Sequence, residues 1–254
     1  MPRTPIFVAN WKMNKTNSEA IAFITDFLPK VATHTSKIVI APPATALSDI
    51  YKLTQKTKIK LASQSIFYEN NGSFTGEISA EMAKQFCSYV LIGHSERRHL
   101  FGETDKDVNK KIHSALAQKL KPILCIGETK EQKDAGKTEK VLNMQLTSGL
   151  KDVNSEQIKQ ITFAYEPVWA ISKGQQDTNT KPATPEDAQK AHAFIRGWIS
   201  QNYNNEVAKN TKIAYGGSAK PENASELMKQ KDIDGLLVGA ASLDAEKFIK
   251  IITC

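Results

Sequence analysis

Cysteine is scarce in this chain of 254 residues, which contains only Cys87, Cys125 and Cys254. An odd number of cysteines without paired spacing excludes a disulfide framework and indicates free thiols in a reducing compartment. Histidine is also sparse, and its five positions lack the paired helical spacing of a zinc site. We therefore expect no metal ion.

Long hydrophobic runs are missing as well. The apolar runs are about five to seven residues long, whereas a membrane-spanning helix needs roughly 20. Residues 1–9 show neither the apolar core of a signal peptide nor the character of a transit peptide. We therefore expect a cytoplasmic protein without membrane association.

The charge balance is basic, with 34 Lys and Arg against 27 Asp and Glu, a formal net charge of +7. This excess suits an anionic ligand. The lysines are scattered along the sequence, and no basic helix alternates with aromatic residues, so we expect no nucleic acid partner. Hydrophobic residues at 40% and charged residues at 24% are typical of a globular protein.

Short apolar runs alternate with helical patterns at a period of about 30 residues, the length of a strand with its crossover helix. The predicted strands are 6–9, 37–41, 59–63, 89–92, 122–126, 161–165, 212–215 and 235–238. The predicted helices are 18–31, 45–53, 105–120, 138–150, 185–202, 223–229 and 245–251. Eight such units predict an α/β fold, a (β/α)8 TIM barrel, with a doubly wound open sheet as the alternative. No composition break marks a linker, so residues 1–254 are expected to form a single domain.

Unusual polar residues follow several of the predicted strands. In a barrel, all strand exits meet at one rim, where active sites lie. The exits carry Asn10 and Lys12, then His94 and Glu96, then Cys125, Glu166, Ser218, and Gly239 with Ala240. We expect these residues to face a common mouth.

Glu166 ends the sixth predicted strand and is followed at once by Pro167. Proline disfavours helical backbone in the residue before it, so Glu166 is expected to stay extended at the mouth of the fold. A carboxylate among apolar neighbours there is a candidate general base. An isolated Glu-Pro pair is more often a polar turn, so the catalytic role needs partners elsewhere in the chain.

His94 follows the fourth predicted strand and opens a predicted short helical turn. The positive end of a helix disfavours a second proton on the ring, so we expect a neutral imidazole. Such a ring can donate a hydrogen bond to a carbonyl group and exchange that proton. The alternative is a histidine that merely caps a strand end, but a position opposite Glu166 favours the catalytic role.

Glycine-rich turns follow the last two strands, with the sequences Tyr215-Gly216-Gly217-Ser218 and Gly239-Ala240-Ala241-Ser242. Such turns aim amide hydrogens at an anion, at the position where barrels bind phosphate. Either turn alone could be a simple tight connection, but on adjacent strands they favour a phosphate site. Lys12 would usually be a solvated lysine, but its place directly after the first strand favours a fixed cation for a phosphate and a developing oxyanion.

These groups fit proton transfer between the carbons of a small phosphorylated hydroxy-carbonyl compound, which requires no cofactor. The motifs that carry them are Asn10-Trp11-Lys12-Met13-Asn14, Phe74-Thr75-Gly76-Glu77, Gly93-His94-Ser95-Glu96-Arg97-Arg98, Tyr165-Glu166-Pro167-Val168-Trp169-Ala170-Ile171, Tyr215-Gly216-Gly217-Ser218 and Leu237-Val238-Gly239. As an ordered set along the whole chain, they closely resemble the triosephosphate isomerase family.

The resemblance implies interconversion of dihydroxyacetone phosphate and D-glyceraldehyde 3-phosphate through an enediol or enediolate, in glycolysis and gluconeogenesis. It implies Glu166 as the base and His94 as the electrophile, a pairing established for the family. Lys12 would be the electrostatic stabiliser, and Asn10 would be an additional donor to the substrate.

Further positions follow from the same resemblance. Glu96 and Cys125 would support the site, and the amide of Ser172 would join the phosphate contacts. Thr75 belongs to a loop that crosses a dimer interface in the family, so the resemblance also implies a homodimer.

The chain departs from the family after Ile171. The family reads Gly-Thr-Gly-Lys before the next helix, whereas residues 172–182 make this lid longer by about six residues, which loop-closure entropy tolerates at under about 1 kcal/mol. We hypothesise that the extra polar residues loop outward, with residues 167–169 and 182–184 as hinges. Ala240 also replaces a glycine that is frequent in the family.

Two alternative functions stay open. Another phosphate-binding barrel enzyme acting on a larger substrate would need a further carboxylate or lysine at a strand end, and the sequence shows none. A binder of phosphate ligands without catalytic activity is supported only by the altered lid. A coupled assay with glyceraldehyde 3-phosphate separates both from the isomerase.

Overall fold

The computed structural model describes residues 3–171 and 182–254, and in this part of the chain eight parallel strands form one closed barrel. The strands are β1 (Ile6–Asn10), β2 (Lys37–Ala41), β3 (Lys60–Ser63), β4 (Tyr89–Ile92), β5 (Lys121–Ile126), β6 (Thr162–Tyr165), β7 (Ile213–Tyr215) and β8 (Gly235–Val238). Neighbours in sequence pair with one another, and β8 closes against β1, with Ile6 opposite Gly235. The predicted (β/α)8 barrel is confirmed, and the open sheet is excluded.

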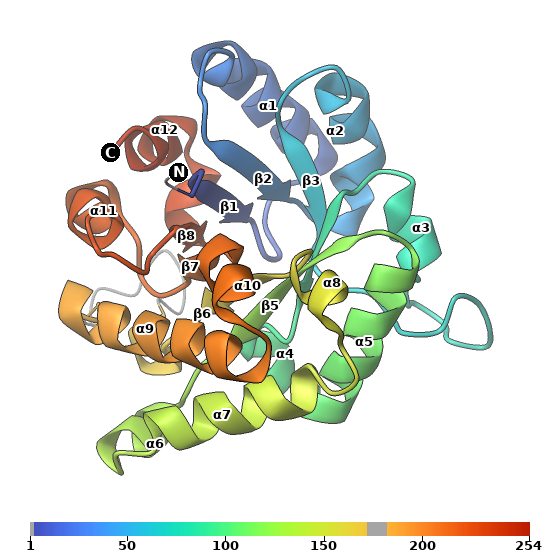
Figure 1. Ribbon diagram of the computed structural model, residues 1–254. Coiled ribbons are helices and arrows are strands. Elements are labelled where there is room, and N and C mark those ends of the chain that lie inside the picture. The colour runs from blue at the N-terminus through green and yellow to red at the C-terminus, as the bar shows by residue number, and fades with distance from the viewer. Residues whose placement is uncertain (1–2, 172–181) are drawn as a thin grey trace.

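Helices surround the barrel, as Figure 1 shows. The α-helices of the described residues are α1 (Asn17–Val31), α2 (Leu47–Thr54), α3 (Ala80–Lys84), α4 (Ser95–Leu100), α5 (Asp105–Ala117), α6 (Lys130–Asp134), α7 (Thr138–Gly149), α8 (Ser155–Ile158), α9 (Pro185–Asn202), α10 (Asn205–Asn210), α11 (Pro221–Met228) and α12 (Ala245–Ile252). Three short 3-10 helices are η1 (Ala44–Ala46), η2 (Val168–Ala170) and η3 (Ala240–Leu243). None of the helices in the described part is long and apolar enough to cross a membrane.

The predicted long helices agree with the structure to within a few residues. The helix predicted at 185–202 matches α9 at both ends, because the Thr184 hydroxyl accepts the N–H of Asp187 and Pro185 occupies the first turn. The short helices α3, α6, α8 and α10 were missed, since four to six residues cannot show the helical apolar period.

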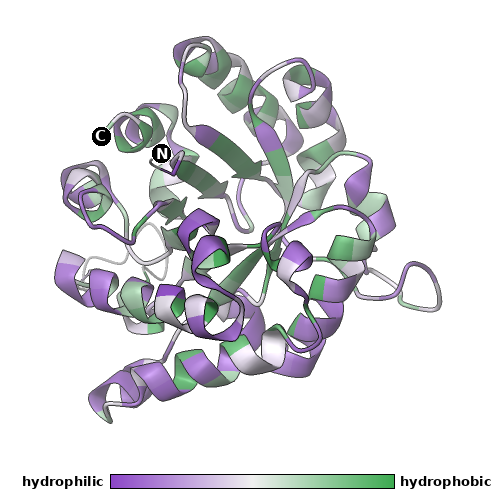
Figure 2. Ribbon diagram, viewed as in Figure 1, coloured by the Kyte–Doolittle hydropathy of each residue, from purple (hydrophilic) through white to green (hydrophobic). Residues whose placement is uncertain are grey.

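The strands are buried on both faces, which explains why they read as continuous apolar runs. Alternate residues such as Val8, Val39 and Leu91 fill the barrel interior, while those between them pack against the helices. Outside the barrel, the rings of Phe27 and Phe248 stack at 5.6 Å and join α1 to α12. Figure 2 shows the same division, with apolar strands and helices that carry polar residues on their outer sides.

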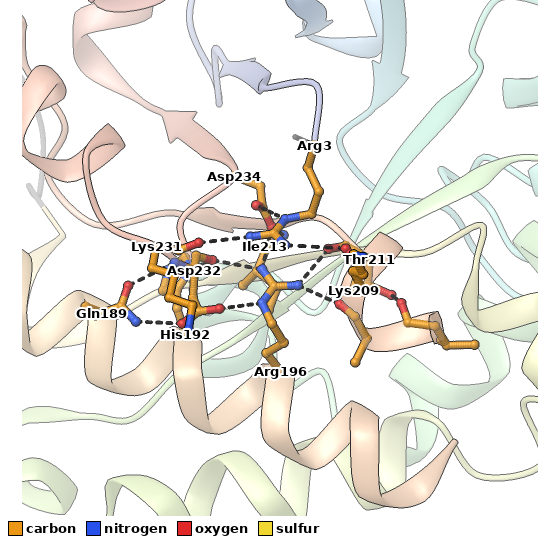
Figure 3. Close-up of polar contacts among 12 residues, drawn as sticks. Arg3, Gln189, His192, Arg196, Lys209, Thr211, Ile213, Lys231, Asp232 and Asp234 are labelled. Atoms are coloured by element: carbon orange, nitrogen blue, oxygen red, sulfur yellow. Dashed lines mark hydrogen bonds and ion pairs between the residues drawn. The ribbon is translucent and has the colours of Figure 1, made fainter. Parts of the chain in front are cut away.

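A buried ionic cluster fixes the amino-terminal end of the barrel (Figure 3). Arg196 of α9 contacts Asp232 at 2.6 Å and Asp234 at 2.7 Å. It also donates to the carbonyl oxygens of Ala208 and Thr211, at 2.7 and 3.0 Å. One guanidinium thus ties α9 to the segments that lead into β7 and β8, at the end of a barrel that carries stability rather than chemistry.

Candidate active site

The carboxyl ends of the strands surround a cavity of about 760 Å³. The predicted site residues that line it are Asn10, Lys12, His94, Glu166, Ser218, Gly239 and Ala240. They come from the exits of β1, β4, β6, β7 and β8, which lie far apart in the sequence. The barrel therefore gathers them at the rim where catalytic groups of this architecture lie.

Glu166 directly follows β6 and is 1% exposed. Its carboxylate Oε2 accepts the backbone N–H of Ser95 at 2.8 Å. Its Oε1 lies 3.0 Å from Nε2 of His94, but the contact lacks hydrogen-bond geometry, so this oxygen has no donor among the described residues. One oxygen is held in place, and the other keeps its lone pairs available.

His94 is the N-cap residue of α4, which confirms the predicted helical turn. Its Nδ1 accepts the backbone N–H of Glu96 at 3.3 Å. A nitrogen that accepts a hydrogen bond carries no proton, so in the neutral ring the proton is on Nε2. The ring is 6% exposed, and Nε2 is the nitrogen close to the carboxylate of Glu166.

Three glycines leave the space that Glu166 and Pro167 occupy. A Cβ atom on Gly127 would lie 1.8 Å from the carbonyl oxygen of Glu166, and one on Gly216 would lie 2.8 Å from its Cγ. A Cβ atom on Gly217 would lie 2.2 Å from the hydroxyl of Tyr215 and 3.1 Å from Pro167. The sequence predicted phosphate contacts for the glycines after β7, but the structure shows that they also make room for the carboxylate.

Lys12 has left-handed backbone, with φ of 52°. Its N–H donates to Oδ1 of Asn10 at 3.1 Å, and its carbonyl accepts from Gln64 at 2.8 Å, so hydrogen bonds on both sides hold a conformation that costs about 1–3 kcal/mol. Its ammonium group contacts Oε1 of Glu96 at 2.6 Å. A Cβ atom on Gly239 would lie 3.6 Å from Cε of Lys12, so the cation borders the turn after β8.

The amides predicted to bind phosphate differ in whether they already have a hydrogen-bond partner. Gly239 and Ala240 begin η3, where the first amide groups of a helix have no partner within the helix. Ala240 does not have positive φ, so alanine fits this position as well as glycine. The amide of Ser218, in contrast, donates to the carbonyl oxygen of Ala170 at 2.9 Å. Ser172 and the rest of the inserted segment up to residue 181 lie outside the described residues.

Two of the supporting predictions lie away from the cavity. Cys125 is fully buried in the barrel interior; burial and then the nearby charge of Glu166 raise the pKa of its thiol well above the ordinary value. Thr75 is exposed in the segment 64–79, which extends away from the barrel (Figure 1). Within one chain, the structure does not bring Thr75 to the site.

Glu128 is a buried carboxylate at the exit of β5, so the expectation that the sequence has no further carboxylate at a strand end was wrong, although Glu128 does not line the cavity. It is 1% exposed and accepts from the Tyr165 hydroxyl at 3.0 Å and from Nε1 of Trp169 at 2.8 Å. Its carbonyl oxygen accepts the N–H of Val168 at 3.0 Å. Glu128 therefore anchors the segment predicted as the first hinge, and its position directly after β5 and Gly127 was the available signal.

Comparisons with known proteins show which family the chain resembles. The model of the triosephosphate isomerase family matches residues 5–254. The triosephosphate isomerase of Alkaliphilus metalliredigens is 47% identical over 251 residues, which cover 98% of this chain and 99% of the relative. That of Geotalea uraniireducens is 45% identical over 252 residues and 98% of each chain. That of Chloroherpeton thalassium is 47% identical over 250 residues and 97% of each chain.

Proposed function

Because this chain belongs to the triosephosphate isomerase family and is an aldose-ketose isomerase, we propose that it interconverts dihydroxyacetone phosphate and D-glyceraldehyde 3-phosphate through an enediol or enediolate. The observation that carries the mechanism is the 3.0 Å contact between Oε1 of Glu166 and Nε2 of His94 at the wall of the cavity. A substrate of three carbons that docks in the cavity against this pair can meet a base and a proton donor at once.

Glu166 takes the proton from the carbon next to the carbonyl group in this proposal. Its Oε2 is held by the Ser95 amide, and Oε1 has no donor among the described residues, so the lone pairs of Oε1 are available to a C–H group. The same carboxyl group returns the proton to the neighbouring carbon, which turns the ketose into the aldose. Burial excludes water that would otherwise compete for the carboxylate.

His94 polarises the carbonyl oxygen and moves protons between the two oxygens of the intermediate. The Glu96 amide occupies Nδ1, which places the proton of the neutral ring on Nε2. A neutral N–H donor can give its proton to an enediolate and take one back without passing through a doubly protonated ring. Support for this role comes from the geometry of α4, where His94 is the N-cap residue and its Nε2 lies at the wall of the cavity, close to Glu166.

Lys12 supplies positive charge to the oxygen that becomes anionic and to the substrate phosphate. It lines the cavity and borders Gly239, so one ammonium group can face both. Its partner Glu96 is the residue whose amide orients His94, so the two positions are coupled. Asn10 holds the Lys12 backbone and offers a further donor.

The phosphate group of the substrate is placed at the turns after β7 and β8. The amides of Gly239 and Ala240 at the start of η3 supply donors, together with the hydroxyl of Ser218. The Ser218 amide becomes available only if its bond to Ala170 opens. We include Ser172 and place Cys125 as a support beneath Glu166. No cofactor or metal is part of the proposal.

The test is a coupled assay with glyceraldehyde 3-phosphate on the wild type and Glu166→Gln. Removal of a general base lowers turnover by roughly 10²–10⁴-fold, while binding of a phosphate analogue should be spared. Glu139→Gln, an exposed carboxylate on α7, is the matched control and should retain full activity. Full turnover in Glu166→Gln would remove this residue from its role, and an inactive wild type that binds the analogue would favour the non-catalytic binder.

We also propose a homodimer in the cytoplasm, with residues 1–254 of each chain forming one domain. A second cavity of about 360 Å³ adjoins Lys12 and Glu96, and Met13 and Phe101 beside it are 96% and 70% exposed. Exposed apolar groups of this kind mark a protein interface. The projecting segment with Thr75 from a second copy is the proposed occupant, so the partner would cover the side of the site at Lys12.

Light scattering after size-exclusion chromatography tests the dimer. The wild type should have twice the mass of one chain, and Thr75→Arg should shift it towards the monomer with loss of turnover. Thr147→Arg, an exposed threonine of α7 outside this segment, is the control for the added charge and should leave the mass and the turnover unchanged. A wild type that is monomeric and fully active would contradict the proposal.

A further inference from the structure

A lysine begins or directly precedes four strands of the barrel. Lys37, Lys60 and Lys121 are the first residues of β2, β3 and β5. Lys212 directly precedes β7, where its carbonyl oxygen accepts the N–H of Phe163 at 2.9 Å and continues the ladder. All four therefore lie at the amino-terminal end of the barrel, opposite the cavity with Glu166.

The four lysines lie on the inward side of their strands. Side chains two residues apart in a strand share a face. Val39, Ala62 and Ile123 each follow a lysine by two residues and belong to the barrel interior. Ala214, two residues after Lys212, lies between residues that pack outward against the helices. The lysines thus converge on the barrel axis from four different strands.

Tyr89 of β4 forms the floor of this end and is 3% exposed. The ammonium groups of Lys37 and Lys121 lie 6.0 and 5.9 Å from the centre of its ring. Burial, together with the nearby ammonium groups of Lys37 and Lys121, lowers the pKa of Lys212. Two ammonium groups therefore lie over one ring with that of Lys212 close to both, and Lys60 lies at the exposed rim.

In the part of the chain that the structure describes, residues 3–171 and 182–254, no carboxylate forms an ion pair with these lysines within 4.0 Å. Asp234 is the acidic residue that acts on Lys212, but Arg3 and Arg196 occupy its carboxylate (Figure 3). One of its oxygens also accepts the N–H of Ile213 at 2.9 Å. The charge of the lysines is left without a counter-ion from the described chain.

We propose that the amino-terminal end of the barrel binds a compact oligophosphate anion, free or carried by a nucleoside, between Lys37, Lys121 and Lys212, with Lys60 at the rim. Such an anion brings several negative charges into a small volume, which matches ammonium groups that converge on one axis. A nucleic acid strand would instead need a cationic stripe with exposed aromatic rings, and Tyr89 is buried.

Isothermal titration calorimetry at low ionic strength tests the site with inorganic triphosphate and with a nucleoside triphosphate as probes. The double variant Lys37→Gln with Lys212→Gln should bind both probes at least about tenfold more weakly, since one charge contact near 4 Å in water is worth roughly fivefold. The change removes like-charge repulsion, so the variant should fold, and its turnover should match that of the wild type because the lysines lie far from Glu166.

Two controls locate the binding. Lys140→Gln, an exposed lysine of α7, should bind the probes as the wild type does. Lys12→Gln separates this site from the catalytic cavity and should retain triphosphate binding. Stronger binding of the nucleoside triphosphate would identify a nucleotide as the ligand, equal binding would identify the phosphate chain alone, and either result supports the site. A wild type that binds neither probe, a double variant with unchanged affinity, or loss of binding in Lys12→Gln would overturn the proposal.

Discussion

Gly216→Ala tests whether the glycine after β7 sets the position of the catalytic carboxylate. The new Cβ atom would lie 2.8 Å from Cγ of Glu166 and 3.3 Å from the carbonyl oxygen of Tyr165. Ordinary contact begins at 3.4 Å, so the Glu166 side chain must move by roughly half an ångström or more. Displacements near 1 Å cost up to about 10²-fold in rate. We expect turnover to fall about 10- to 100-fold with little change in KM.

Urea unfolding on the same variant separates loss of position from loss of fold. Overpacking at this site should lower the free energy of unfolding by about 1–3 kcal/mol, which leaves the barrel folded. Gly197→Ala in α9 is the matched control, because nothing lies within 4 Å of its added Cβ atom. It should gain about 0.5–1 kcal/mol from helix propensity and keep full turnover. A folded Gly216→Ala enzyme with turnover within twofold of the wild type would refute the reasoning.

Three further predictions concern stability. Burial lowers the pKa of His192 from 6.5 to about 3, so the folded chain keeps this ring neutral while the unfolded chain takes up a proton. The stabilisation is complete above pH 6.5 and falls by about 1.4 kcal/mol per pH unit below it, so about 2 kcal/mol is lost at pH 5. Urea unfolding at several pH values should therefore show that the free energy of unfolding depends less steeply on pH in His192→Gln than in the wild type. The exposed His99→Gln should keep the pH dependence of the wild type. Arg196→Lys removes the branched guanidinium that contacts both Asp232 and Asp234, so the free energy of unfolding should fall by about 3–5 kcal/mol with unchanged turnover. Lys159→Met removes the exposed ion pair with Glu156 and should lower the free energy of unfolding by under about 1 kcal/mol. Trp169→Phe removes one donor from the buried Glu128 and should cost about 1–3 kcal/mol; unchanged stability would mean that water replaces the indole N–H.

The fold and the centre of the site could be predicted because both depend on local signals. Each strand is an apolar run, each long helix has an apolar period, and the strand order follows the chain. Once all strands are parallel, every exit lies at one rim, so Asn10, Lys12, His94 and Glu166 had to share a mouth. The helix N-terminus at His94 was readable for the same reason, since it depends on adjacent residues.

Other features depend on distances between segments and left no such signal. The sequence shows glycine at positions 127 and 216, but only the packing of β5 and β7 against β6 shows that Glu166 fills the space. Glu128 reads as a polar residue after a strand, and its role needs the positions of Tyr165 and Trp169. Thr75 could be assigned only by resemblance, because its proposed contact is with a second copy of the chain.

The clustering of the lysines at the amino-terminal end of the barrel could not be predicted from the sequence either. In the sequence, Lys37, Lys60, Lys121 and Lys212 are far apart, and the net charge of +7 looked evenly spread. A closed barrel places the first inward residue of every strand around one axis, so separation along the chain does not keep these charges apart. Net charge describes the whole molecule, whereas an anion responds to the few ammonium groups within about 10 Å of it. Closure of the barrel therefore decides where these four lysines meet, and an anionic ligand should be sought at the barrel axis.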